Sequence, residues 1–237
     1  MRPVIGISCA WSQETWGADA TKNVYDYVAR SYVSAIYRAG GIPVLIPPVA
    51  KNTDLEACAE EVLNRLDGMY FSGGGDVRRK DGSILSDLYA QQPTRARWED
   101  ALLKAAYRRN LPVLGVCRGY QMMAVAFGGT MDPVRLPEHL QTAPFDRGIH
   151  DISIVPDSLL AQIAGAARWC VNSIHVEHVK TVPQGFEAVA RTTDGVIEAI
   201  AARERSFFLG TQFHPELMGE DPRALAVLRS FVAAAEC

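Results

Sequence analysis

One cysteine has neighbours that suit a catalytic nucleophile. Cys117 follows the apolar run Val113 to Val116 and precedes a helical pattern, so a strand would end and a helix begin at the thiol. Such an elbow projects the nucleophile outward, and Gly115 and Gly119 would let neighbouring segments approach closely. The helix N-terminus also favours the reactive thiolate. The alternative is a buried cysteine without function, one of five in the chain with Cys9, Cys58, Cys170 and Cys237.

A histidine and a carboxylate two residues apart follow another apolar run. The segment reads Thr211-Gln212-Phe213-His214-Pro215-Glu216. In extended chain, residues i and i+2 point to the same side, and Pro215 restricts the backbone of His214. Glu216 would then accept the imidazole N–H while the other ring nitrogen faces the thiol, which is the nucleophile–base–orienter order of a catalytic triad. The alternative is a surface His-Pro turn with a solvated Glu216.

A glycine-rich segment supplies candidate backbone donors. Ser72-Gly73-Gly74-Gly75 follows the expected strand 68–71. Thiolate attack on an amide produces an oxyanion, which preorganised N–H groups stabilise, and glycine lets backbone approach a substrate closely. We expect the amides of Gly74 and Arg118 to form this oxyanion hole. The alternatives are a flexible loop or a phosphate-binding turn, although the Gly-Lys-Ser/Thr pattern of a P-loop is absent.

The remaining pattern predicts the sheet that would bring these segments together. Short apolar runs alternate with amphipathic stretches in the first half, which predicts an α/β fold with a mostly parallel sheet and helices on both faces. Shorter strands and an Asp-Gly turn at 194–195 follow, which predicts a small antiparallel extension. Polar stretches at 78–93 and 131–148 are expected to be loops over the strand ends. The expected strands are 3–8, 42–46, 68–71, 113–116, 150–155, 169–171, 186–191, 196–200 and 207–212, and the expected helices are 25–39, 54–64, 94–109, 118–127 and 222–234.

Composition argues against several classes of protein. Of the 237 residues, 48% are hydrophobic and 22% charged, which suits a sizeable core and disfavours disorder. The net charge of -3, with no Lys/Arg-rich block, disfavours a nucleic-acid partner. The chain also lacks a membrane-spanning apolar run, a signal-peptide pattern and a CxxC pair. We therefore expect a cytoplasmic protein of one domain, residues 1–237, with no membrane partner, no metal and no other cofactor; a homodimer stays open as the commonest assembly.

Together the motifs resemble the class I glutamine amidotransferase superfamily. Gly-x-Cys-x-Gly-x-Gln at 115–121, the glycine loop at 73–75 and His214-Pro215-Glu216 carry this resemblance. Further stretches resemble its stand-alone hydrolase branch, the peptidase C26 family of γ-glutamyl-γ-aminobutyrate hydrolase-like proteins. The resemblance covers nearly the whole chain, and the branch-level stretches are 40–43, 66–68, 171–175, 194–199 and the pair Arg95 and Glu99.

The resemblance implies a fold and further site residues. It implies a flavodoxin-like core, that is, a single glutamine amidotransferase type 1 domain over residues 1–237. Gln121 and the backbone around Ser173 and His175 would hold the glutamyl head of a substrate, and Arg95 and Glu99 would lie near the site entrance. The alternative for Arg95 and Glu99 is an i,i+4 surface ion pair, and for His175 a satisfied strand histidine.

The expected activity is hydrolysis of the γ-glutamyl amide bond of a small γ-glutamyl compound. Cys117 would form a γ-glutamyl-thioester with His214 as base and Glu216 as orienter, and glutamate and an amine would be released. Two alternatives stay open: a glutaminase subunit that delivers ammonia to a separate synthetase, and a non-catalytic binding or stress protein on the same fold. The leaving amine is not specified, and γ-aminobutyrate, a polyamine, an amino acid and folate-linked glutamate are all candidates.

The chain departs from the family pattern on the leaving-group side of the expected pocket. Val176-Glu177-His178, Ala96 and the stretch 77–80 stand where relatives in the family carry other residues. The basic run Arg78-Arg79-Lys80 would either meet an acidic leaving group or be a solvated charge run.

Overall fold

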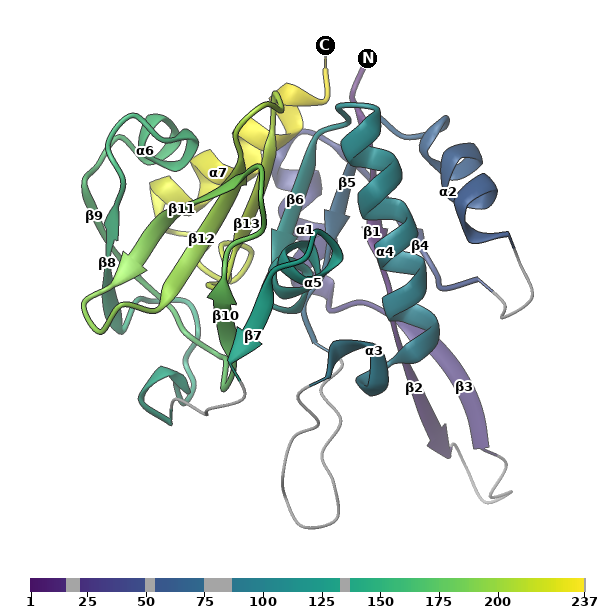
Figure 1. Ribbon diagram of the computed structural model, residues 1–237, viewed down its shortest axis with the longest axis horizontal. Helices are drawn as coiled ribbons and strands as arrows, with labels where there is room; N and C mark the ends of the chain where they lie inside the picture. Colours follow the sequence, from purple (N-terminus) through teal and green to yellow (C-terminus); the bar gives the residue numbers. More distant parts are fainter. Residues whose placement is uncertain (16–21, 50–53, 75–86, 133–136, 237) are drawn as a thin grey trace.

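A nine-stranded sheet forms the centre of the molecule (Figure 1). The computed structural model describes residues 1–15, 22–49, 54–74, 87–132 and 137–236. The first five strands in spatial order are mutually parallel and the last four are antiparallel, so the predicted mostly parallel sheet with an antiparallel extension is confirmed. In that order the strands are β4 (Ile42–Ile46), β1 (Val4–Ser8), β5 (Gly68–Phe71), β6 (Val113–Val116), β13 (Phe208–Thr211), β12 (Ile197–Ala202), β11 (Phe186–Thr192), β8 (His150–Ile154) and β9 (Arg168–Val171).

Helices cover both faces of this sheet, as the sequence predicts. On one face α7 contacts α1 and α6, and on the other α4 contacts α2, α3 and α5, so each face has its own hydrophobic core. The helices are α1 (Arg30–Ala39), α2 (Leu55–Leu63), α3 (Leu88–Gln91), α4 (Pro93–Arg108), α5 (Arg118–Ala126), α6 (Leu159–Ala164) and α7 (Pro222–Ala234). Side-chain caps fix four of their starts, because Asp54, Asp87, Ser158 and Asp221 accept backbone N–H groups of the first turn.

Several short elements were not predicted. β2 (Ala10–Thr15) pairs with β3 (Lys22–Tyr27), β7 (Thr130–Asp132) pairs with β10 (His178–Thr181), and a 3₁₀ turn, η1, spans Pro137–His139. The helix predicted from residue 25 is therefore wrong in its first turn and begins at Arg30. Valine and tyrosine at 24, 25 and 27 favour a strand, and Tyr27 pairs with Ala10.

The two predicted loops are also only partly correct. α3 and the first residue of α4 lie within 78–93, and the end of β7 and η1 lie within 131–148. Residues 75–86 and 133–136, including the basic run Arg78-Arg79-Lys80, lie outside the described residues. The expectation of a single domain stays a prediction.

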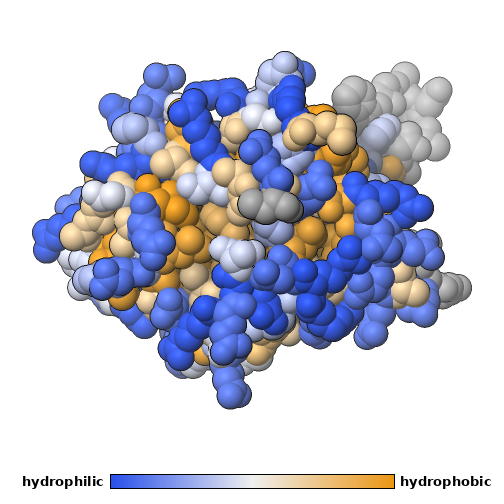
Figure 2. Space-filling model, turned by 90° about the horizontal axis from the view of Figure 1, so that it is seen from above, coloured by the Kyte–Doolittle hydropathy of each residue, from blue (hydrophilic) through white to orange (hydrophobic). Residues whose placement is uncertain are grey.

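The surface is mainly hydrophilic where Figure 2 shows it, on the side of the termini, with hydrophobic residues in smaller areas between. Ile42, Val44 and Leu45 are exposed on the edge strand β4, with which only β1 of the described chain pairs. Within the described ranges no helix has both the length and the apolar character to cross a membrane.

Helix α5 packs so closely on β5 that Gly119 has no room for a side chain. A Cβ at Gly119 would lie 2.1 Å from the carbonyl oxygen of Phe71, and one at Gly115 would lie 2.9 Å from the carbonyl oxygen of Gly119. The predicted need for glycines on either side of Cys117 thus has a steric cause. They allow the turn after β6 to lie directly against the neighbouring strand.

Gly119→Ala should lower the free energy of unfolding by about 1–3 kcal/mol, because the new Cβ pushes α5 away from Phe71. The same displacement should slow alkylation of Cys117, which lies at the N-terminus of α5. Urea unfolding and iodoacetamide kinetics measure the two effects.

Gly128→Ala is the matched control for this substitution. It follows the same helix, and nothing lies within 4 Å of the added Cβ. Its φ of 95° should cost about 1–2 kcal/mol of strain, but leave Cys117 as reactive as before. Equal alkylation rates in the two variants would contradict the proposed packing constraint.

Candidate active site

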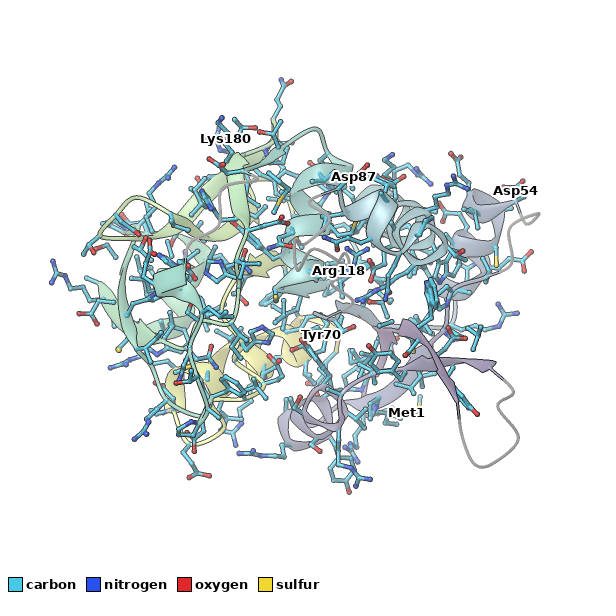
Figure 3. The ribbon with its side chains drawn as sticks, turned by 90° about the horizontal axis from the view of Figure 1, so that it is seen from below. Met1, Asp54, Tyr70, Asp87, Arg118 and Lys180 are labelled. Carbon is cyan, nitrogen blue, oxygen red and sulfur yellow. The ribbon has the colours of Figure 1, made fainter. Side chains whose placement is uncertain are left out.

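Cys117 occupies a strained turn between β6 and α5. Its φ of 53° and ψ of -110° are unusual for a residue with a side chain, and it is the N-cap of α5. Its N–H donates to the carbonyl oxygen of Thr211 on the adjacent strand β13, at 2.8 Å. Figure 3 views this edge of the sheet from below, with Arg118 of α5 and Tyr70 of β5 near the middle. The predicted elbow is present.

His214 and Glu216 follow the end of β13, beside β6. His214 Nδ1 lies 2.7 Å from Glu216 Oε1, and both residues are buried at 8% exposure. The alternative of a surface turn with a solvated glutamate is therefore wrong. Asn172 holds the backbone of His214 from both sides, because its Oδ1 accepts the His214 N–H at 2.8 Å and its Nδ2 donates to the His214 carbonyl at 3.1 Å.

The thiol of Cys117 and the imidazole of His214 face each other beside Gly73. A Cβ at Gly73 would lie 3.2 Å from Cys117 Cβ and 3.3 Å from His214 Cε1. Burial by itself lowers the pKa of His214, but the charges of Glu216 and Cys117 and its hydrogen bonds to both outweigh burial and raise that pKa well above its usual value. A raised pKa keeps the His214 imidazole protonated near neutral pH, as a cation beside Cys117.

A fully buried arginine fixes the shape of the glycine loop. Arg95 Nη1 donates to the Gly74 carbonyl at 2.8 Å, and Nη2 donates to the carbonyls of Ser72 at 2.7 Å and Gly73 at 3.3 Å. Its Nε pairs with Glu99 Oε1 at 2.7 Å, and both side chains are 0% exposed. The surface ion pair considered for these residues is therefore excluded. Their contacts are with the loop backbone, and a direct contact with substrate stays a prediction.

Tyr32 is a site residue that the sequence did not reveal. Its hydroxyl accepts the Gly73 N–H at 2.9 Å, which leaves the next amide, that of Gly74, as the loop's candidate oxyanion donor. Burial and then the charge of Glu216 raise the pKa of Tyr32, so its hydroxyl stays neutral. In the sequence, Tyr32 is one of several apolar residues on the buried face of α1, and no motif distinguishes it from the others.

The three residues predicted to hold the glutamyl head are buried and bonded within the protein. Gln121 Nε2 donates to the Glu177 carbonyl and to Gln212 Oε1, each at 3.1 Å. Ser173 Oγ donates to the His139 carbonyl at 2.6 Å, and His175 Nε2 lies 3.2 Å from Glu198 Oε1. This geometry matches the alternative for His175, a histidine whose hydrogen bonds are made within the protein. A contact between substrate and any of the three residues stays a prediction.

A cavity of about 220 Å³ lies beside His214. The junction between β3 and α1 forms one wall, the glycine loop another, and its lining is mostly apolar. The sequence did not predict this wall, because its pattern predicts a helix already from residue 25. The lining residues are Ala10, Tyr27, Val28, Ala29, Ser31, Tyr32, Ser72, Gly73, Gly74, His214, Glu216 and Leu217.

The sheet order and its helix layers form the flavodoxin-like fold of class I glutamine amidotransferases. A solved structure from Thermoplasma acidophilum, described as a candidate component of GMP synthase, is similar with a TM-score of 0.64. The match covers 100% of this chain and 96% of that one, and at 16% sequence identity it concerns the fold alone.

The sequence comparisons identify the family. The model of the peptidase C26 family matches residues 3–216, and the chain belongs to this family. Protein NtpR of Enterococcus hirae is 30% identical over 92% of each chain. A γ-glutamyl-γ-aminobutyrate hydrolase of Escherichia coli O157:H7 is also 30% identical, over 90% of this chain and 85% of that protein. Family and relatives together support a hydrolase of amide bonds.

His214→Gln should slow alkylation of Cys117 by iodoacetamide at least about ten-fold near neutral pH, because an amide cannot pair with a thiolate as an imidazolium does. Peptide mapping by mass spectrometry separates this thiol from the others. Cys9 should react slowly, since burial and Asp26 raise its pKa to about 11. His178→Gln on β10 is the control, and equal rates in the two variants would refute the pairing.

Tyr32→Phe should lower kcat about ten-fold and change KM little, because the Gly73 N–H loses its acceptor and the loop loses its fixed orientation. Tyr70→Phe is the matched control. Tyr70 packs edge-on against Tyr32 with ring centroids 5.3 Å apart, and its buried hydroxyl has no hydrogen-bond partner among the described residues. Steady-state kinetics decide, and a loss of kcat in both variants would assign the effect to packing instead.

Proposed function

We propose that this protein hydrolyses the γ-glutamyl amide bond of a small γ-glutamyl compound, with Cys117, His214 and Glu216 as its catalytic triad. The observation that carries the proposal is the order of side chains from the partly buried Cys117 through the buried His214 to the buried Glu216, in which His214 and Glu216 are joined by a 2.7 Å hydrogen bond. Such an order is that of a nucleophile, its base and the group that orients the base.

The first half of the reaction forms a thioester. The Cys117 sulfur attacks the γ-carbonyl carbon, and the carbonyl oxygen becomes an oxyanion. The amides of Gly74 and Arg118 are the proposed donors to this oxygen. Gly74 belongs to the loop that Arg95 holds, and Arg118 is the first residue of α5, where amides point out of the helix toward the nucleophile.

Collapse of this intermediate breaks the carbon–nitrogen bond. The His214 imidazolium transfers its proton to the departing nitrogen, and the amine leaves a γ-glutamyl-thioester on Cys117. Water then attacks the thioester carbonyl while His214 accepts its proton. The carbon–sulfur bond breaks, glutamate is released, and the thiolate–imidazolium pair is restored.

The position of His214 suggests where the leaving group lies. A general acid must reach the departing nitrogen, and the 220 Å³ cavity opens beside His214. We place the leaving amine there, against the wall formed by Tyr27 and Val28. The glutamyl head would then extend toward Gln121, Ser173 and His175, as the family resemblance implies, with Arg95 and Glu99 positioning the loop between.

The substrate class rests on the names of relatives. Four of them are named γ-glutamyl-γ-aminobutyrate hydrolases, at 29–30% identity over 90% of this chain. We therefore propose a γ-glutamyl-γ-aminobutyrate-like compound as substrate. The mostly apolar wall of the cavity is compatible with the short methylene chain of such an amine.

Cys117→Ala should abolish turnover, lowering kcat at least about a thousand-fold, because no covalent intermediate can form. Its thermal unfolding midpoint should stay close to that of the wild type. Cys58→Ala on α2 is the matched control and should keep full activity. Glutamate release from γ-glutamyl-γ-aminobutyrate, other γ-glutamyl amides and glutamine is the assay, and normal turnover by Cys117→Ala would end the proposal.

The same assay separates the hydrolase from the glutaminase alternative. Purified protein alone should hydrolyse a γ-glutamyl amide steadily, with that amide preferred over glutamine. Release of ammonia from glutamine only after addition of a synthetase would assign the chain to the glutaminase alternative.

A further inference from the structure

Three imidazoles surround one buried carboxylate outside the triad. Glu198 on β12 is 0% exposed. His175 Nε2 lies 3.2 Å from its Oε1, and His139 Nδ1 and His150 Nε2 each lie 3.7 Å from the same oxygen. The histidines come from η1, from the start of β8 and from the segment between β9 and β10, so the cluster joins separate parts of the antiparallel half of the sheet (Figure 1).

Two buried polar atoms of this cluster have no hydrogen-bond partner within the described residues. They are Oε2 of Glu198 and Nε2 of His150. A buried carboxylate oxygen and a buried imidazole nitrogen without partners are costly, unless another group occupies the space between them. Both atoms can offer a lone pair, and a metal ion satisfies lone pairs of this kind.

The outer nitrogen of His139 is held as in metal sites. His139 Nε2 lies 3.0 Å from Asp194 Oδ2. A carboxylate or carbonyl on the far nitrogen fixes the tautomer and the ring orientation of a ligating histidine. In His139 this arrangement leaves Nδ1 directed toward Glu198.

We propose that His139 Nδ1, His150 Nε2 and the Glu198 carboxylate bind a divalent transition-metal ion of the zinc class. The three ligand atoms lie within 4.8 Å of one another. Tetrahedral coordination with bonds near 2.1 Å needs ligand atoms about 3.4 Å apart, so small side-chain rotations close the site. The His139 Nδ1 contact to His175 Nε2, now 3.3 Å, is replaced by the metal bond.

The ligand set selects the class of ion. Two imidazole nitrogens and one carboxylate suit zinc and its neighbours, whereas magnesium and calcium prefer a shell of oxygen atoms. A water molecule takes the fourth position, and His175 stays hydrogen-bonded to Glu198 as an outer group. No sequence pattern indicates this site, because its ligands come from positions 139, 150 and 198 without a short repeated spacing.

The ion has a structural role in this proposal and takes no part in amide hydrolysis. It ties η1 and β8 to β12, and the His139 carbonyl accepts the hydroxyl of Ser173 at 2.6 Å. The backbone of Glu198 accepts the N–H of Gln212 at 2.7 Å, at the end of β13. A bound ion therefore orders the segments that lie beside the proposed glutamyl subsite.

Metal binding is tested on untagged, chelator-treated protein that carries Cys117→Ala, so that the reactive thiol and His214 do not compete. Equilibrium dialysis against zinc should give one equivalent per chain, and magnesium and calcium at the same concentration should not displace it. His150→Gln in this background should weaken zinc binding about 100-fold, while His178→Gln, outside the cluster, should not change it.

A second measurement does not depend on the folding of the His150→Gln variant. X-ray absorption of the zinc-loaded Cys117→Ala protein should show imidazole nitrogens near 2.0–2.1 Å and no sulfur. Zinc should also raise the thermal unfolding midpoint. Absence of a saturable site, a sulfur ligand, or unchanged affinity in a folded His150→Gln variant would overturn the proposal, and none of these outcomes bears on hydrolysis by the triad.

Discussion

The buried guanidinium of Arg95 is the interaction on which the candidate active site depends. A buried charge is tolerated only when it is paired and its hydrogen-bonding capacity is met, and Glu99 and three loop carbonyls meet that of Arg95. Because these carbonyls point toward Arg95, the N–H groups of the same peptide units point away from it. The loop that flanks the thiol and the imidazole thus owes its conformation to a cation that substrate need not touch.

This arrangement extends to the start of the chain. Ser8 Oγ, at the end of β1, donates to Glu99 Oε1 at 2.8 Å and accepts the N–H of Ser72 at 3.1 Å. Tyr32 accepts the next amide of the loop, from α1 on the other face of the sheet. Three segments that are distant in sequence, β1, α1 and α4, therefore meet at one loop of small residues. Each contributes a buried hydrogen bond to the loop, and Cys117 and His214 lie beside it.

Sequence patterns predicted the parts of the structure that depend on local chemistry. Apolar runs located every strand of the central sheet, and the glycines around Cys117 indicated the elbow. The partners of Arg95 were not predictable, because an i,i+4 pair looks the same on a surface helix as on a buried one. β2 and β3 were not predicted, because a hairpin depends on pairing between two strands whose individual patterns are weak. The helix predicted from residue 25 also overlapped the end of β3. Tyr32 and Asn172 bind backbone groups of segments that are distant in sequence. A local sequence pattern does not predict such contacts.

Hydrogen bonds connect the histidine cluster with the segments that hold Cys117 and His214, because Glu198 is on β12 and β12 pairs with β13. The carbonyl of Glu198 accepts the Gln212 N–H, and Gln212 Oε1 accepts from Gln121 in the first turn of α5. Two residues beyond Gln212 the chain reaches His214. A backbone hydrogen bond and an amide pair therefore join Glu198 to the segments that carry Cys117 and His214. Substitution of Glu198 would displace β13 as well as remove a proposed metal ligand, and only a direct measurement of bound metal distinguishes these two effects.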